Sequence, residues 1–191
     1  MAEQAEQLRR AAAGLDENFV EAVRLLTACR GRAVAVGIGK SGIAARKVAA
    51  TLACTGFPAF YLHPGDGAHG DLGAVTSDDI VIAISVSGST REVVWLLPHF
   101  AQLGVPVVAI TANPESPLGR AAEVVLQAHV QDNTPAPTAS TLVTQALGDA
   151  LAVAVMEARE LSADDVAPLH PGSPGSQRIR ATSETRLVPA E

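Results

Sequence analysis

The stretch Val81-Ile82-Ala83-Ile84-Ser85-Val86-Ser87-Gly88-Ser89-Thr90-Arg91-Glu92 carries the pattern that decides the fold of this chain. It begins with an apolar run that is short enough for one buried strand. It then breaks into small hydroxylated residues around Gly88, and the segment from Glu92 to Leu97 is typical of the start of a helix. We therefore expect a buried strand, a turn rich in serine and threonine, and a helix, in that order.

The turn in this unit is the first candidate for a ligand site. The first backbone N–H groups of a helix have no partner within the helix, and the helix dipole is positive at that end, so the turn favours an anion. Hydroxyl groups add donors without bulk, at Ser85, Ser87, Ser89 and Thr90. The turn lacks both the Walker ending and the GxGxxG pattern, so a single phosphate monoester fits better than a nucleotide. The alternative is a helix capped by one hydroxyl, without any ligand.

A second unit of the same design lies earlier in the chain. A short strand at residues 33–36 is followed by the turn Gly37-Ile38-Gly39-Lys40-Ser41-Gly42 and by a helix that we expect to reach Leu52. Glycines allow the backbone to approach a ligand closely. Ser41 can cap the helix or donate to an anion, and Lys40 favours negative charge, although it could equally be a solvated loop lysine.

Five short apolar segments alternate with helices, at residues 33–36, 59–62, 81–84, 105–111 and 124–126. This alternation predicts an α/β fold with a five-stranded parallel sheet, helices on both faces, and ligands at the carboxyl ends of the strands. Residues 3–30 should form one amphipathic helix, or two broken near Gly14, which covers its own sheet or crosses to a second subunit. Its stripe contains Leu8, Leu15, Phe19, Val23 and Leu26. Residues 138–159 should form a long apolar helix with a core of Leu142, Leu147, Leu151 and Val155.

The totals indicate the class of protein. A length of 191 residues suits one domain, which we place at residues 1–176, followed by a frayed tail at 177–191. The net charge of −6 and the scattered lysines and arginines argue against a nucleic-acid partner. We see neither a membrane-spanning run nor a signal peptide, and so expect a soluble, cytoplasmic protein. Cys29 and Cys54 are expected to be buried thiols. His63, His69 and His129 lack the spacing of metal ligands.

Several motifs, in their order along the chain, resemble the sugar isomerase (SIS) domain and, within it, arabinose 5-phosphate isomerases. They are Gly39-Lys-Ser-Gly42, His63-Pro-Gly65, Ala68-His-Gly-Asp-Leu-Gly73, Ala83-Ile-Ser-Val-Ser-Gly88, Ala136-Pro-Thr-Ala-Ser-Thr141, Gly148-Asp-Ala-Leu-Ala-Val153 and Leu169-His-Pro-Gly172. The resemblance runs from about residue 10 to residue 180. It implies a flavodoxin-like three-layer α/β/α fold, usually a homotetramer with sites between subunits, and interconversion of ribulose 5-phosphate and arabinose 5-phosphate without a cofactor.

The resemblance also implies roles for particular residues. The catalytic positions of the family match Lys40, His69, Glu92 and His170. The positions that bind substrate and phosphate match Gly39, Ser41, Ser85, Ser87, Gly88, Ser89 and Thr90. A further glutamate of the family is replaced here by Asp132 or Asn133, and the segment after His170-Pro-Gly172 differs from the usual one. Many relatives carry two cystathionine-β-synthase-type modules after this domain, and this sequence does not include them.

The chemistry of an aldose–ketose isomerase requires a base, a group that stabilises the enediolate, and an acid that opens the sugar ring. Glu92 is the expected base, although a glutamate in a first turn can simply stabilise the helix dipole. Lys40 would neutralise the enediolate, and His170 would open the ring or carry protons, reaching a neighbouring subunit's site. No metal is required. Two alternatives stay open: an isomerase of a hexulose or heptulose phosphate, and a sugar-phosphate sensor that binds without turnover.

Overall fold

Five parallel strands form one sheet in the order β2-β1-β3-β4-β5. The computed structural model describes residues 1–130, 132 and 136–172. The strands are β1 (Ala33–Val36), β2 (Ala59–Leu62), β3 (Ile80–Ile84), β4 (Val107–Thr111) and β5 (Val124–Gln127), and all four pairings are parallel. The predicted five-stranded parallel sheet is confirmed.

The strand expected at residues 105–111 begins two residues late. The N–H of Val105 donates to the carbonyl of Phe100 at 3.0 Å, so Val105 closes the end of the preceding helix. Pro106 has no N–H to give to the sheet, and the ladder therefore begins at Val107. The predicted start was wrong because Val105 is apolar but belongs to the end of the helix and not to β4.

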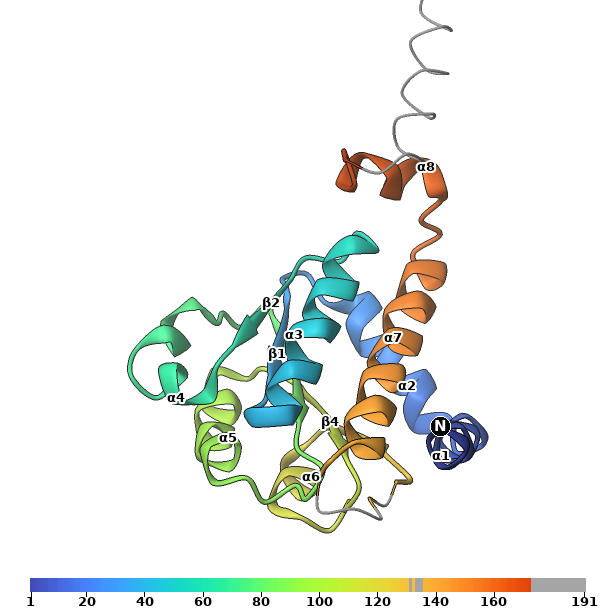
Figure 1. The fold of residues 1–191 in the computed structure, drawn as a ribbon. Coiled ribbons are helices and arrows are strands. Elements are labelled where there is room, and N and C mark those ends of the chain that lie inside the picture. Colours follow the sequence, from blue (N-terminus) through green and yellow to red (C-terminus); the bar gives the residue numbers. More distant parts are fainter. Residues whose placement is uncertain (131, 133–135, 173–191) are drawn as a thin grey trace, which may run out of the picture.

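Helices cover both faces of the sheet, which gives three layers (Figure 1). On one face, α2 (Glu17–Ala28), α3 (Gly39–Cys54) and α7 (Ala139–Ala158) share a core with Ala33, Ala35, Ile80 and Ile82. On the other face, α5 (Arg91–Leu103) and α6 (Pro117–Ala121) share a core with the alternate strand residues, such as Val34 and Val81. The alternation of side chains along each strand thus supplies both cores.

The N-terminal region forms two helices rather than one. Helix α1 (Ala2–Ala13) ends before Gly14, and Asp16 caps α2 by accepting a hydrogen bond from the N–H of Asn18 at 3.0 Å. Both helices pack on α7, and α2 also packs on β5, so α2 covers part of its own sheet; the other expectation, a crossing to a second subunit, stays a prediction. The stripe is only partly buried: Leu26 is fully buried, whereas Leu15 is 43% exposed because it lies in the link between the helices.

Helix α7 is the central helix of its face. Leu147, Leu151 and Val155 are buried as predicted, but the prediction for Leu142 is wrong, since it is 36% exposed. Among the described residues, α7 is the one helix long and apolar enough to span a membrane, against our expectation that no such run exists. Half of it is buried against neighbouring helices of the domain, which is the environment of a core helix.

The remaining helices are short. They are α4 (Pro64–Gly67), the 3₁₀ turn η1 (Asp71–Ala74), α8 (Ala163–Val166) and the 3₁₀ turn η2 (Ala167–Leu169). Figure 1 shows α4 beside α5, and α8 beyond the C-terminal end of α7. The tail expected at 177–191 lies outside the described residues.

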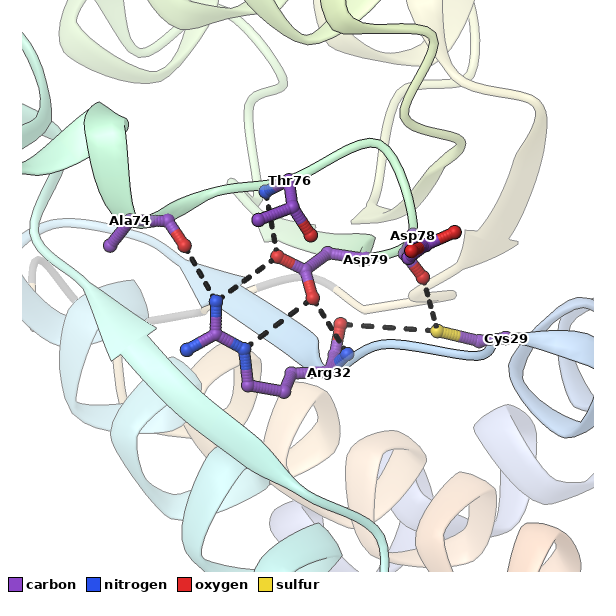
Figure 2. Close-up of polar contacts among 6 residues, drawn as sticks. All are labelled: Cys29, Arg32, Ala74, Thr76, Asp78 and Asp79. Atoms are coloured by element: carbon purple, nitrogen blue, oxygen red, sulfur yellow. Dashed lines mark hydrogen bonds and ion pairs between the residues drawn. The ribbon is translucent and has the colours of Figure 1, made fainter.

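The amino ends of β1 and β3 are joined by a buried carboxylate (Figure 2). Asp79 is 2% exposed and accepts hydrogen bonds from the backbone N–H groups of Arg32 at 2.7 Å and Thr76 at 2.8 Å. The guanidinium of Arg32 pairs with the same carboxylate at 3.3 Å. Burial alone would raise the pKa of Asp79, but these donors outweigh it and hold the pKa below its usual value. This cluster joins β1 and β3 at the amino edge of the sheet, which is opposite to the edge with the glycine and serine turns.

The two cysteines are free and half-buried rather than fully buried. Cys29 lies beside the Asp79 cluster, where its thiol is 3.2 Å from the carbonyl of Asp78 (Figure 2). Burial raises the pKa of the Cys29 thiol, so it stays protonated at neutral pH. Cys54 is the last residue of α3, and its thiol lies 3.1 Å from the carbonyl of Thr51.

Candidate functional site

A cavity of about 360 Å³ lies at the carboxyl edge of the sheet, where three separate segments of the chain meet. The turn after β1, the turn after β3 and the region around the start of α7 each contribute to it. It is lined by Ile38, Lys40, Ser41, Val86, Ser87, Thr90, Asp132, Pro137, Ser140 and Thr141. The sequence predicted that the first two turns share this edge, and the structure brings their residues together.

The serine turn after β3 is organised by a hydroxyl that does not line the cavity. Ser85 is 1% exposed; its Oγ lies 2.7 Å from Oγ1 of Thr90 and accepts a hydrogen bond from the N–H of Gly88 at 3.1 Å. Gly88 has φ of 66°, and a Cβ there would come within 1.8 Å of Oγ of Ser116, so only glycine fits. Ser85 and Gly88 therefore shape the turn, while Ser87 and Thr90 face the cavity.

Ser89 faces another hollow. Its N–H donates to Oγ of Ser87 at 3.3 Å, which closes a small local turn. Its side chain helps to line a neighbouring hollow of about 670 Å³ together with Arg91, Glu92 and the 62%-exposed Trp95. Of the four hydroxyls that the sequence grouped together, that of Ser85 thus lies inside the turn, those of Ser87 and Thr90 line the cavity, and that of Ser89 lies at the neighbouring hollow.

Two helices begin at the cavity without a side-chain cap. Helix α3 has Ile38 at its N-cap, and α5 has Thr90 there, with no capping hydrogen bond from either side chain. The Thr90 hydroxyl is engaged with Ser85 instead. Among the described residues, no side chain is hydrogen-bonded to the first N–H groups of α3 or α5, so these groups and the positive ends of both dipoles are open to an anion. The alternative of a helix capped by its own hydroxyl does not describe α3 or α5.

The glycine turn brings Lys40 to the same cavity. Gly39 has φ of 59°, a left-handed conformation that glycine adopts without strain, and apart from its own helix and chain neighbours no described atom lies within 4 Å of the Cβ that another residue would carry there. Lys40 and Ser41 follow in the first turn of α3 and both line the cavity. Lys40 is exposed, so its ammonium group can reach a ligand there.

A third helix, α7, begins at the cavity, but its N-terminus is already occupied. The carboxylate of Asp132 accepts hydrogen bonds from the N–H groups of Thr138 and Ser140, both at 3.1 Å, and from the Ser140 hydroxyl. Burial tends to raise the pKa of Asp132, but these donors prevail and lower it. Asp132 is thus a helix cap with reduced basicity. Asn133, the other position considered for this role, lies outside the described residues.

The four candidate catalytic residues do not meet within one chain. Lys40 lines the cavity, and Glu92 lies in the first turn of α5 beside the neighbouring hollow. His69 is exposed in the loop between α4 and η1. His170 follows η2, where its Nδ1 is 3.2 Å from the carbonyl of Val166.

The segment before His170 packs at the amino end of β2, on the edge of the sheet opposite to the cavity. Leu161, Val166 and Leu169 line a hollow there together with Ala59 at the start of β2. Helix α8, which leads through η2 to His170, lies beyond the C-terminal end of α7 (Figure 1), whereas the Lys40 cavity lies at the start of α7.

Sequence reasoning missed several residues of the cavity. Ser140 and Thr141 belong to a motif that carried the resemblance, but no role was assigned to them. The cap formed by Asp132 was also missed, because a residue that lies six to eight positions before the N–H groups it binds leaves no local pattern. In the part of the chain that the structure describes, no three His, Cys, Asp or Glu side chains come together as metal ligands would.

Comparison with known proteins gives the chain a family. A model described as the SIS domain matches residues 25–154. The chain is similar to the arabinose 5-phosphate isomerase KdsD of Pseudomonas aeruginosa, with 52% identity over 171 residues, which cover 87% of this chain and 52% of that protein. It is 49% identical to KdsD of Escherichia coli K12 over 83% of this chain and 49% of that protein. The chain spans about half the length of the curated relatives it matches.

Solved structures share the fold over most of the chain. One described as E. coli CFT073 c3406 in complex with A5P has a TM-score of 0.86 and 35% identity, covering 90% of this chain and 93% of that one. The Vibrio vulnificus NanR protein complexed with ManNAc-6P has a TM-score of 0.70 and 22% identity, covering 97% of this chain and 66% of that one. At that identity, the second likeness shows the fold alone.

Proposed function

This chain belongs to the SIS domain family, and on that basis we propose that it interconverts D-ribulose 5-phosphate and D-arabinose 5-phosphate through an enediol. The named activity of the KdsD relatives supports this reaction, as does the A5P ligand named for the similar solved structure. The proposed substrate is a small sugar phosphate, with no cofactor, no nucleic acid and no membrane partner, and the proposed compartment is the cytoplasm.

The observation that carries the proposal is the pair of uncapped helix N-termini at the cavity. The first N–H groups of α3 and α5, the hydroxyls of Ser87 and Thr90, and the ammonium group of Lys40 supply donors and positive charge there. A phosphate monoester presents the matching charge and acceptors. In this proposal Gly39 and Ser41 line the approach to the sugar, and Ser85, Gly88 and Ser89 hold the shape of the phosphate turn.

Proton transfer between C1 and C2 is assigned to groups around this phosphate site. Glu92 is the proposed base because it lies two residues after Thr90 in the first turn of α5. Lys40 stabilises the negative charge that develops on the enediolate oxygens. Neither group requires a metal ion for this role.

His69 and His170 enter this proposal from a second subunit. Within one chain, His69 is exposed and His170 lies at the opposite edge of the sheet. A homotetramer with sites between subunits would bring such residues to a neighbour's cavity. The exposed Trp95, together with Val94 and Pro98, gives α5 an outward apolar surface that such an assembly could bury.

The reaction is tested by incubating the protein with ribulose 5-phosphate in the presence of a chelator and following the products by NMR. Formation of arabinose 5-phosphate supports the proposal, including its metal-free part. Loss of activity in chelator that zinc restores contradicts the metal-free part. In a panel of hexulose and heptulose phosphates, turnover of one of these in place of ribulose 5-phosphate would identify another isomerase. Binding of a sugar phosphate without turnover of any of them would identify a sensor.

A further inference from the structure

Tyr61, the single tyrosine of the chain, touches the backbone of the glycine turn. It lies on β2, where its Cα pairs with that of Ala35 on β1. Its hydroxyl donates a hydrogen bond at 2.8 Å to the carbonyl of Gly37, the residue that directly follows the neighbouring strand β1. Gly37 is the first residue of the turn that presents Lys40 to the cavity.

The contact is sterically enclosed. A Cβ on Gly42 would lie 3.0 Å from the Gly37 carbonyl oxygen and 3.1 Å from the Tyr61 hydroxyl, so the first turn of α3 packs directly on this hydrogen bond. A Cβ on Gly37 would come within 2.7 Å of the Ser41 carbonyl. The Tyr61 hydroxyl, the Gly37 carbonyl and the start of α3 therefore form one packed unit.

Arg46 also contacts the aromatic ring of Tyr61. Its guanidinium carbon lies 3.9 Å from the centroid of the Tyr61 ring, a cation–π contact made one helical turn after Gly42. Burial raises the pKa of Tyr61, so its hydroxyl keeps its proton at neutral pH and remains a donor. Both the position and the protonation of the donor are thus fixed by its neighbours.

We propose that Tyr61 is a positioning residue which, by holding the Gly37 carbonyl, fixes the place of Lys40 in the cavity. A turn that contains Gly37 and Gly39 has more backbone freedom than other sequences, so an external restraint matters there. Among the described residues, Tyr61 is the one side chain that is hydrogen-bonded to the backbone of residues 37–40. The catalytic consequence rests on the proposed function, in which Lys40 stabilises the enediolate.

Tyr61→Phe tests the role because it removes the donor and keeps the ring. We expect kcat for ribulose 5-phosphate to fall about 2- to 10-fold, the range that one neutral hydrogen bond corresponds to. KM should change less than about 2-fold, since the phosphate contacts of Ser87 and Thr90 are untouched. The matched control is Thr55→Val, which removes a hydroxyl at the far end of α3 that bonds to the carbonyls of Thr51 and Leu52. It should leave kcat unchanged.

A double-mutant cycle with Lys40→Met separates positioning from general loosening of the fold. If Tyr61 acts through Lys40, Tyr61→Phe should have no further effect on kcat once the ammonium group is gone. A fall in kcat of the same size in both backgrounds would overturn the proposal.

Amide hydrogen exchange of the ligand-free protein tests the restraint without any turnover. Exchange at residues 42–45, the first amides of α3 with partners inside the helix, should be faster in Tyr61→Phe than in the wild type, with β4 unchanged. Equal exchange in the two proteins would refute the restraint. A wild type that turns over no sugar phosphate would defeat the proposed function alone, because the exchange comparison still tests the contact.

Discussion

Replacing Asp132 decides between two roles for its carboxylate. Its position at the cavity is compatible with a catalytic base, whereas its hydrogen bonds are those of a helix cap. Asp132→Asn keeps the shape and one acceptor oxygen but removes the charge and the basicity. The carboxylate already accepts bonds from two backbone N–H groups and the Ser140 hydroxyl, and its pKa is lowered. We therefore expect this variant to lose stability rather than turnover.

The two roles differ in magnitude. Loss of a general base lowers kcat by about 10²–10⁴-fold, which corresponds to about 3–5 kcal/mol of activation free energy. Loss of a charged cap weakens charge-assisted hydrogen bonds, but asparagine caps helices nearly as well as aspartate, and Asp132 is only half-buried. We expect the free energy of unfolding to fall by about 1 kcal/mol and kcat to fall less than about 10-fold.

The assay compares kcat and thermal unfolding in three variants. Glu92→Gln, at the proposed base, should lower kcat by about 10²–10⁴-fold and leave stability nearly unchanged, since Glu92 is exposed. Asp79→Asn is the matched control, because it replaces another carboxylate bound by backbone N–H groups, but at the opposite edge of the sheet. Solvent deuterium incorporation into the substrate reports the proton-transfer step directly. A hundredfold loss of exchange in Asp132→Asn with a mild effect of Glu92→Gln would refute this assignment.

Three further results are expected. Ser87→Asp places a like charge beside the phosphate, so sugar-phosphate affinity measured by calorimetry should fall strongly in a folded protein; unchanged affinity would locate the phosphate elsewhere. Asp79→Asn should lower the unfolding free energy by about 2 kcal/mol at pH 7. Because the pKa of Asp79 is lower in the folded protein than in the unfolded chain, this difference should begin to shrink below about pH 4, where the unfolded chain is protonated first. It should be lost as the pH falls through the lowered pKa of the folded state, and a pH-independent difference in denaturant titrations would argue against the cause given. Light scattering should give a tetramer, and a monomer at micromolar concentration would contradict the shared sites.

Much of the fold could be predicted because short apolar runs bounded by turns leave few alternatives. The segments at residues 33–36 and 59–62 were located to the residue. The exposure of Leu142 could not be predicted, because α7 is apolar on several sides and its buried face depends on how α1, α2 and α3 pack against it. Periodicity marks a core face only where the opposite face is polar.

The meeting of the two turns at one cavity was predicted for a topological reason. Parallel strands end at one edge, so Lys40 and Ser87 had to come near each other once the sheet was parallel. Sequence could not tell that Ser85 points into its own turn while Ser87 points out, because both are small hydroxyls two residues apart. Nor could it place His170, whose edge of the sheet depends on where the chain goes after α7.

The charges around the cavity explain why a sugar monophosphate suits a protein whose net charge is −6. Each uncapped N-terminus, of α3 and of α5, carries the equivalent of roughly +0.5, and Lys40 adds one full charge. Asp132 carries one negative charge against roughly +0.5 at the N-terminus of α7, which leaves about −0.5 at that side of the cavity. The remaining charge of about +1.5 matches the −1.5 to −2 of a phosphate monoester and falls well short of the charge of a triphosphate. In the proposed function Lys40 serves both this balance and the enediolate, so the proposed placement of Lys40 by Tyr61 would connect the binding of the substrate to its conversion.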